Sequence, residues 1–220
     1  MMQLTIKKFT VNPIEENTYV VSDPATRQAS IIDCGCFDES EWEPLQQYIA
    51  DNDLTPVHLL CTHAHFDHVL GTAFAAQAYG LTPQCHEADL PLWQQMDTQV
   101  TMFLGNYGTR LLQSLHLPQP TPLREGDTID LGTKSLQVIA TPGHTAGGIC
   151  FYCATDDVLF SGDSLFRGSI GRTDLPGGNY ATLVKSLTTH ILTLPPHTRV
   201  FCGHGQDTSI DYELNYNPYL

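Results

Sequence analysis

Short apolar runs, separated by polar turns, recur along this chain and predict strands that alternate with helices. In the first half they predict strands at residues 4–9, 18–21, 29–33, 57–61 and 82–86. In the second half they predict strands at residues 128–129, 136–140, 149–153, 158–161 and 199–202. A helix is expected at 41–52, where Trp42, Leu45 and Ile49 follow helical spacing, and further helices at 71–79, 88–116, 181–192 and 209–214.

Two successive strand-rich halves with helices outside them predict an α/β fold, a four-layer αββα sandwich. We expect residues 1–220 to form one domain, because no repeat, low-complexity tract or linker interrupts the pattern. A helical insert around residues 90–117 adds many apolar side chains. Three interpretations of this insert stay open: it packs onto the sandwich, it overhangs a site as a lid or pocket wall, or it forms the contact of a homodimer.

The densest polar cluster follows the apolar run at 57–61. It holds three histidines and one aspartate within six residues, namely His63, His65, Asp67 and His68. Imidazole and carboxylate groups are the usual protein ligands of zinc and iron. Because a strand alternates its side chains and a loop folds back, His63 and His65 can face one metal while Asp67 and His68 face a neighbour. The segment therefore predicts a metal site.

Three later segments share one arrangement, an apolar strand followed by a glycine-containing turn and one candidate ligand. His144 follows the strand at 136–140, Asp163 follows the run at 158–160, and His204 follows the strand at 199–202. Glycine lets the backbone turn sharply and come close to a bound ion. Together with the first cluster, four strand ends are expected to bring ligands to one edge of the fold.

In this order, the segments resemble the metallo-β-lactamase superfamily over most of the chain. The resemblance looks closest to its small glyoxalase II-like (hydroxyacylglutathione hydrolase-like) members. It implies two divalent cations, zinc before iron or manganese, with Asp163 bridging them and Asp67 orienting the nucleophile as the expected catalytic residues. The implied ligands are His63, His65 and His144 for the first metal and Asp67, His68 and His204 for the second.

The implied ligand set suits hydrolysis of a thioester, lactone, amide or phosphodiester, because cations lower the pKa of water that they bind. We expect a thioesterase of the glyoxalase II type that uses a metal-bridging hydroxide. True β-lactamases of this superfamily usually carry Cys or Ser where Asp163 stands. The alternative is a mononuclear iron persulfide dioxygenase, since the Gly-Arg-Thr-Asp segment at 171–174 also resembles that group. Its two histidines and one aspartate would be His63, His144 and Asp163.

The residues after His204 contain no Lys or Arg. Typical glyoxalase II enzymes bind glutathione through basic residues of a C-terminal helical region, so glutathione recognition by that route is absent from this pattern. Arg172 is the nearest basic candidate for an acidic substrate. It is equally placed to pair with Asp174 and stabilise its own loop. The expected partner is a small-molecule thioester.

Composition narrows the partners further. A formal net charge of −14 argues against nucleic acid, because phosphate binding needs a basic surface. Residues 1–9 have no long apolar core, so we expect no signal peptide, no membrane span and a cytoplasmic location. The seven cysteines are an odd number and predict reduced thiols. This includes Cys150 and Cys153, which lie in a strand-like apolar run.

Overall fold

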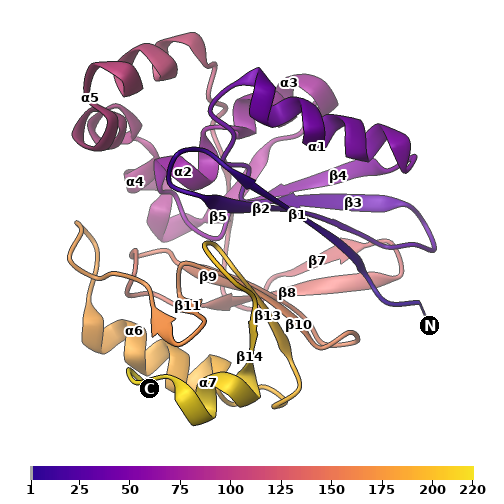
Figure 1. Cartoon of the computed structure of the whole chain (residues 1–220), viewed down its shortest axis with the longest axis vertical. Helices are drawn as coiled ribbons and strands as arrows, with labels where there is room; N and C mark the ends of the chain where they lie inside the picture. The colour runs from indigo at the N-terminus through magenta and orange to yellow at the C-terminus, as the bar shows by residue number, and fades with distance from the viewer. Residues whose placement is uncertain (1) are drawn as a thin grey trace.

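Two six-stranded sheets pack face to face at the centre of the computed structural model, which describes residues 2–220 (Figure 1). Met1, part of the segment in which no signal peptide is expected, lies outside the described residues. The first sheet has the order β1 (Thr5–Val11), β2 (Glu16–Ser22), β3 (Gln28–Ile32), β4 (Thr55–Leu60), β5 (Pro83–His86) and β6 (Thr121–Leu123). The second has the order β14 (Thr208–Ser209), β13 (Arg199–Cys202), β10 (Val158–Gly162), β9 (Ile149–Cys153), β8 (Lys134–Ala140) and β7 (Thr128–Leu131).

Helices cover the outer face of each sheet. Helices α1 (Glu39–Asp51) and α3 (Thr72–Tyr79) pack on the first sheet, and α6 (Tyr180–Ser186) and α7 (Ile210–Tyr216) lie on the second (Figure 1). Between the sheets lies an apolar core that includes Tyr19, Phe151 and Phe160. This arrangement confirms the αββα sandwich, because each sheet buries one face on its partner and the other under helices.

The differences from the sequence expectation concern short elements. Strands β6 and β14 and the hairpin of β11 (Leu165–Phe166) with β12 (Ser169–Ile170) were not predicted. Strands of two or three residues are too short for an alternating pattern to be recognised. The helix expected at 181–192 is α6 followed by a π-helical turn at Leu187–Ile191, which keeps the same apolar side toward the core.

The insert forms a short 3₁₀ turn (Glu87–Asp89), α4 (Leu90–Trp93) and α5 (Met96–Ser114). Helix α5 bends at Gly105, whose φ of 57° and ψ of −141° suit only glycine. Trp93, Met96 and Val100 are buried in a core cluster beneath the insert. The insert therefore packs onto the sandwich, while its role in a homodimer stays a prediction.

All seven cysteines are free thiols and all are buried, as expected. Cys150 and Cys153 lie in the fully buried strand β9. Cys61 and Cys202 occupy buried positions beside two of the ligand turns. Within residues 2–220 no helix combines the length and the apolar character that crossing a membrane requires.

Candidate metal centre

The predicted ligands gather at one edge of the sandwich, where the ends of four strands meet. His63 and His65 follow β4, and Asp67 and His68 lie on the short helix α2 (Phe66–Val69). The other three ligands follow β8, β10 and β13. Backbone hydrogen bonds fasten the two sheets together here, from Ile149 N to Thr62 O at 2.9 Å and from Asn17 N to Gly203 O at 2.7 Å.

Two glycines let the turns come this close. Gly162 has a φ of 49°, and a Cβ on it would overlap the side chain of Thr62. A Cβ on Gly203 would overlap Oδ1 of Asp163. The glycine turns noted in the sequence are therefore required by the crowding at the site.

Six of the predicted ligands form two groups of three, and Asp33, His63 and His68 form a further group that overlaps both. In the first group, His63, His65 and His144, the Nε2 atom of His144 lies 2.9 Å from Nδ1 of His65. In the second group, Asp67, His68 and His204, the two Nε2 atoms are 3.3 Å apart and His204 Nε2 lies 3.5 Å from Asp67 Oδ2. Within each group the donor atoms all lie within 4.8 Å of one another.

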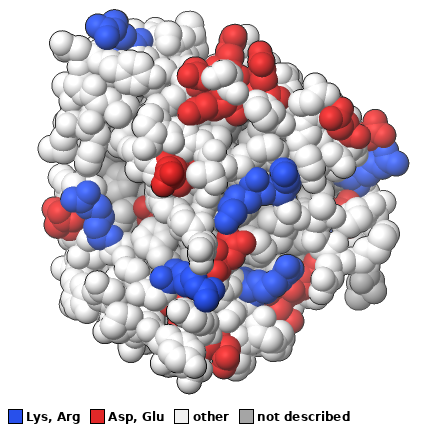
Figure 2. Space-filling model, viewed as in Figure 1, with Lys and Arg blue, Asp and Glu red and all other residues white. Residues whose placement is uncertain are grey.

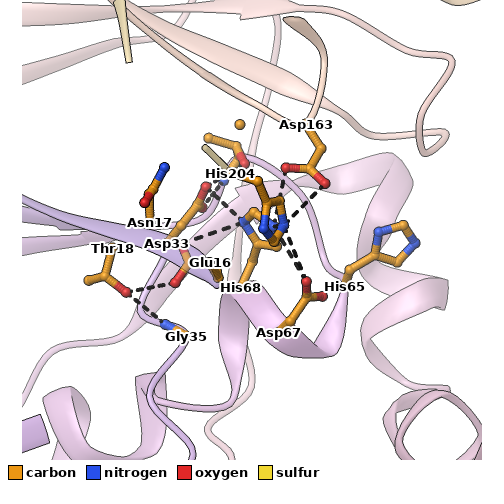
Figure 3. Close-up of polar contacts among 12 residues, drawn as sticks. Glu16, Asn17, Thr18, Asp33, Gly35, His65, Asp67, His68, Asp163 and His204 are labelled. Carbon is orange, nitrogen blue, oxygen red and sulfur yellow. Dashed lines mark hydrogen bonds and ion pairs between the residues drawn. The ribbon is translucent and has the colours of Figure 1, made fainter. Parts of the chain in front are cut away.

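Asp163 lies against both groups. Its Oδ2 is 3.6 Å from Nε2 of His144 in the first group and 3.6 Å from Nε2 of His204 in the second. Its Oδ1 is 3.3 Å from Nε2 of His68 (Figure 3). In Figure 3 Asp163 and Asp67 lie on opposite sides of the imidazole rings of His68 and His204. This position would suit a carboxylate shared between the two groups.

Two buried polar atoms without a hydrogen-bond partner indicate whether the site suits cations. His63 Nε2 and Asp163 Oδ1 are buried, and neither makes a hydrogen bond within residues 2–220. Buried polar atoms are rarely left without a partner, because each one loses the free energy of its contacts with water. Ring nitrogens and carboxylate oxygens that converge on one point are suitable ligands for zinc or iron. The residues present therefore fit a pair of cations.

In three of the histidines the ring orientation is fixed by a contact at Nδ1, on the side of the ring away from the centre. The Nδ1 atom of His68 lies 3.1 Å from Asp33 Oδ2, and that of His144 lies 2.7 Å from the carbonyl oxygen of Arg172. His204 Nδ1 lies 3.2 Å from the carbonyl oxygens of both Ile14 and Glu15. We assign a ring proton to Nδ1 in each case, since the carboxylate oxygen of Asp33 and the carbonyl oxygens act as acceptors. Each Nε2 then faces the centre, where it could bind a cation in place of a proton.

Two buried carboxylates that support the site were not predicted as functional residues. Asp33 accepts hydrogen bonds from the backbone N and the Oγ1 of Thr62, both at 2.7 Å. Asp89 accepts from Ala64 N at 3.0 Å, Thr145 Oγ1 at 2.9 Å and Gly147 N at 2.6 Å. Asp33 directly follows a buried strand, as Asp163 does, and this position could have marked it in the sequence as a residue of the site. Asp89 has no such signal in the sequence.

Gln99 fastens the insert to the ligand loop. Its side-chain oxygen accepts from Phe66 N at 3.1 Å, and its Nε2 donates to Ala64 O at 3.1 Å and to Leu92 O at 2.9 Å. Ala64 and Phe66 flank the ligand His65. Helix α5 is therefore coupled to the position of that histidine.

Burial and mutual charge set the protonation states. Burial lowers the pKa of His63 well below its usual value and that of His65 to about 3, so both are neutral at neutral pH. Burial opposes the charge on Asp163, but neighbouring His68 and His204 outweigh it and hold the pKa of Asp163 well below its usual range. Burial likewise opposes the charge on His68, yet Asp163 and Asp67 raise its pKa well above normal. The carboxylates thus already stabilise positive charge at the place where cations are expected.

A pocket of about 680 Å³ opens above the ligands. Phe103 and Leu104 of α5 line it, which supports the interpretation of the insert as a pocket wall. Arg172 lines the pocket too, but its guanidinium makes two hydrogen bonds of 2.8 Å to Asp174. The sequence left Arg172 between a substrate contact and a loop-stabilising pair, and the structure contains the pair.

Comparison with known proteins decides the family. The model of the metallo-beta-lactamase superfamily matches residues 11–204. The chain belongs to this superfamily. The match, together with the sandwich, confirms the expected fold. The hydroxyacylglutathione hydrolase GloC of Haemophilus influenzae is 34% identical over 219 residues, which cover 99% of this chain and 98% of that protein.

Several solved structures align over nearly the whole of this chain. The B3 metallo-beta-lactamase BLEG-1 is 31% identical with a TM-score of 0.84, covering 98% of this chain and 99% of that one. TTHA1623 in a di-iron-bound form is 38% identical with a TM-score of 0.78, covering 97% and 100%. ETHE1 from Myxococcus xanthus is 29% identical with a TM-score of 0.77, covering 97% and 83%.

Proposed function

We propose that this chain is a binuclear metal-dependent hydrolase that cleaves thioesters, of the hydroxyacylglutathione hydrolase type. The observation that carries the proposal is the position of Asp163, whose oxygens lie 3.3–3.6 Å from ring nitrogens of both ligand groups. A single cation would leave one complete group without a role. The di-iron form of TTHA1623 supports a pair of metals in a related site. Zinc is the metal that we propose first, with iron as the alternative.

Bound divalent cations would lower the pKa of water and polarise a substrate carbonyl. The chain's own residues supply the rest. Burial opposes the charge on Asp67, but His68 and His204 lower the pKa of this carboxyl below normal, so it is ionised at neutral pH. An ionised Asp67 can accept a hydrogen bond from the attacking water and orient it. Asp33 and the carbonyl of Arg172 hold His68 and His144 in fixed ring orientations.

The similarity to GloC favours a thioester among the possible substrates. A phosphodiester is less suited, because Arg172 is the one Lys or Arg that lines the pocket within residues 2–220, and it is paired with Asp174. The similarity to BLEG-1 raises the possibility of β-lactam hydrolysis. Retention of an aspartate at position 163 argues against it.

Metal analysis and a thioesterase assay test the proposal together. Protein purified without added metal should contain close to two metal ions per chain by elemental analysis. It should hydrolyse S-lactoylglutathione, with a KM higher than in enzymes that bind glutathione through C-terminal basic residues. The exposed Asp97, changed to Asn, is a matched control for any site aspartate and should retain full activity. A metal content that never exceeds one, or no thioesterase activity in metal-loaded protein, would refute the proposal.

The second candidate is a mononuclear iron persulfide dioxygenase. Its supporting observation is that His144 Nε2 lies 3.6 Å from Asp163 Oδ2, as a site of two histidines and one aspartate with His63 would require. The Gly-Arg-Thr-Asp segment at 171–174 supports it as well. One iron per chain, with oxygen uptake on glutathione persulfide and no thioester hydrolysis, would favour this function over the first.

A further inference from the structure

The pocket above the ligands has apolar walls on several sides. Phe103 and Leu104 come from α5, Phe166 and Ile170 from the hairpin of β11 and β12, and Ile14 from the turn between β1 and β2. Segments far apart in the sequence therefore contribute apolar side chains to the same pocket. Its floor is formed by the metal ligands, so a reacting carbonyl at the floor places the rest of the substrate among these side chains.

Phe103 has properties expected of a residue that contacts a ligand. It is 42% exposed, although it is a large apolar side chain. Its ring stacks on that of Phe66, with centroids 5.4 Å apart and planes at 25°. The buried side of the same helix, including Met96 and Val100, already packs against the core. Phe103 therefore packs on Phe66 with part of its ring and leaves the rest available to the pocket.

Apart from the metal ligands, the pocket lining offers little positive charge to attract an anionic substrate. Among the described lining residues Arg172 is the one Lys or Arg, and its guanidinium donates two hydrogen bonds of 2.8 Å to Asp174. Most Lys and Arg groups on the face drawn in Figure 2 likewise lie beside acidic groups. Arg167, next to the lining Phe166, stacks on Tyr212 with its guanidinium carbon 4.2 Å from the ring centroid. Glutathione, with two carboxylates, finds few charge partners here.

We infer that this site takes thioesters with an apolar group, aliphatic or aromatic, in preference to thioesters of the charged tripeptide glutathione. The inference rests on the proposed function and narrows its substrate class. The apolar group can be the acyl chain or the substituent on sulfur, since both extend from the carbonyl at the floor. Either one would bury its surface against Phe103, Leu104 and Phe166.

Two series of thioesters test the inference on the metal-loaded enzyme. One varies the acyl chain from acetyl to octanoyl on N-acetylcysteamine. The other keeps the acetyl group and lengthens an alkyl thiol from ethyl to octyl. Burial of a methylene group predicts a rise in kcat/KM of about two- to fourfold per added carbon in one series or both. S-lactoylglutathione should be a poorer substrate than the best member of the rising series.

Variants on α5 test whether the dependence of kcat/KM on chain length arises from contacts with the pocket wall. Phe103→Ala should flatten the dependence of kcat/KM on chain length, because it removes apolar contact area from the pocket wall. Met102→Ala is the matched control, since Met102 is 66% exposed on the same helix and is not a lining residue. It should keep the wild-type dependence.

The outcomes separate this inference from the proposed function. If no thioester is hydrolysed by protein that holds two metals, the proposed function fails. If thioesters are hydrolysed but kcat/KM is flat in both series, or S-lactoylglutathione exceeds every apolar thioester, only the apolar preference is wrong. A slope that Phe103→Ala leaves unchanged overturns the assignment of this pocket wall.

Discussion

Replacing Asp89 by asparagine should loosen the first group of ligands. Asp89 is fully buried and joins the loop of His63 and His65 to the loop of His144. It does so through Ala64 N on one side and Thr145 Oγ1 and Gly147 N on the other. Asparagine has nearly the same shape but only one acceptor oxygen. The substitution therefore removes hydrogen bonds without leaving a cavity.

The size of the effect follows from the hydrogen bonds lost. If the amide oxygen of asparagine takes the place of Oδ2, it still accepts from Ala64 and Thr145. The amide NH₂ group then faces Gly147 N, and two buried donors oppose each other. A hydrogen bond to a charged group contributes about 1.5–3 kcal/mol, and an unsatisfied buried donor costs a further 1–3 kcal/mol, roughly. Partial relaxation should leave a loss of about 2–4 kcal/mol in the free energy of unfolding.

Urea denaturation of the metal-free protein measures this loss directly. The affinity of the first ligand group for metal should also fall by about 10- to 100-fold, as is usual when residues supporting metal ligands are replaced. Competition with a chelator would show the weaker site. Asp97→Asn, at an exposed position of α5, should change neither quantity. An Asp89→Asn protein with wild-type stability and metal affinity would refute the assignment of Asp89 as the connection between the loops.

Three further predictions concern the ligands and the core. Asp163→Ala should abolish turnover and reduce the metal content below one per chain by elemental analysis, because two cations would lose their shared negative charge; near-normal hydrolysis would contradict this. His204→Ala should lose mainly the second metal and His144→Ala mainly the first, and equal losses from both variants would argue against two separate groups. Lys134→Met should lower the free energy of unfolding by about 3–5 kcal/mol, because it leaves the buried Asp156 without its ion pair. Burial opposes the charge on Asp156, but Lys134 and the N–H of Leu4 outweigh it and lower the pKa of this carboxyl, so the stabilisation should be complete above about pH 4 and fade as the pH falls through the lowered value. Urea titrations of both proteins over that pH range would check it.

The sequence was sufficient to predict the two strand-rich halves and the gathering of all seven ligand side chains. Both are determined by local patterns. A buried strand shows itself by its apolar run. Three of the predicted ligands, His144, Asp163 and His204, stand next to glycine turns, and the crowding at Gly162 and Gly203 requires glycine there. Residue type limits the chemistry as well, because imidazoles and carboxylates in one place are suited to few ligands other than cations.

Only the tertiary structure decided which groups Asp33 and Asp89 contact and which side chains line the pocket. Asp89 accepts from Gly147, 58 positions away, and Asp33 holds His68 across 35 positions. Such pairs leave no trace in local spacing, since their hydrogen bonds depend on how two loops approach after the sheets have packed. The insert was undecided in the sequence for the same reason. Some apolar residues of the insert fill the core, and others line the pocket. Which residues do which depends on the direction in which α5 crosses the site.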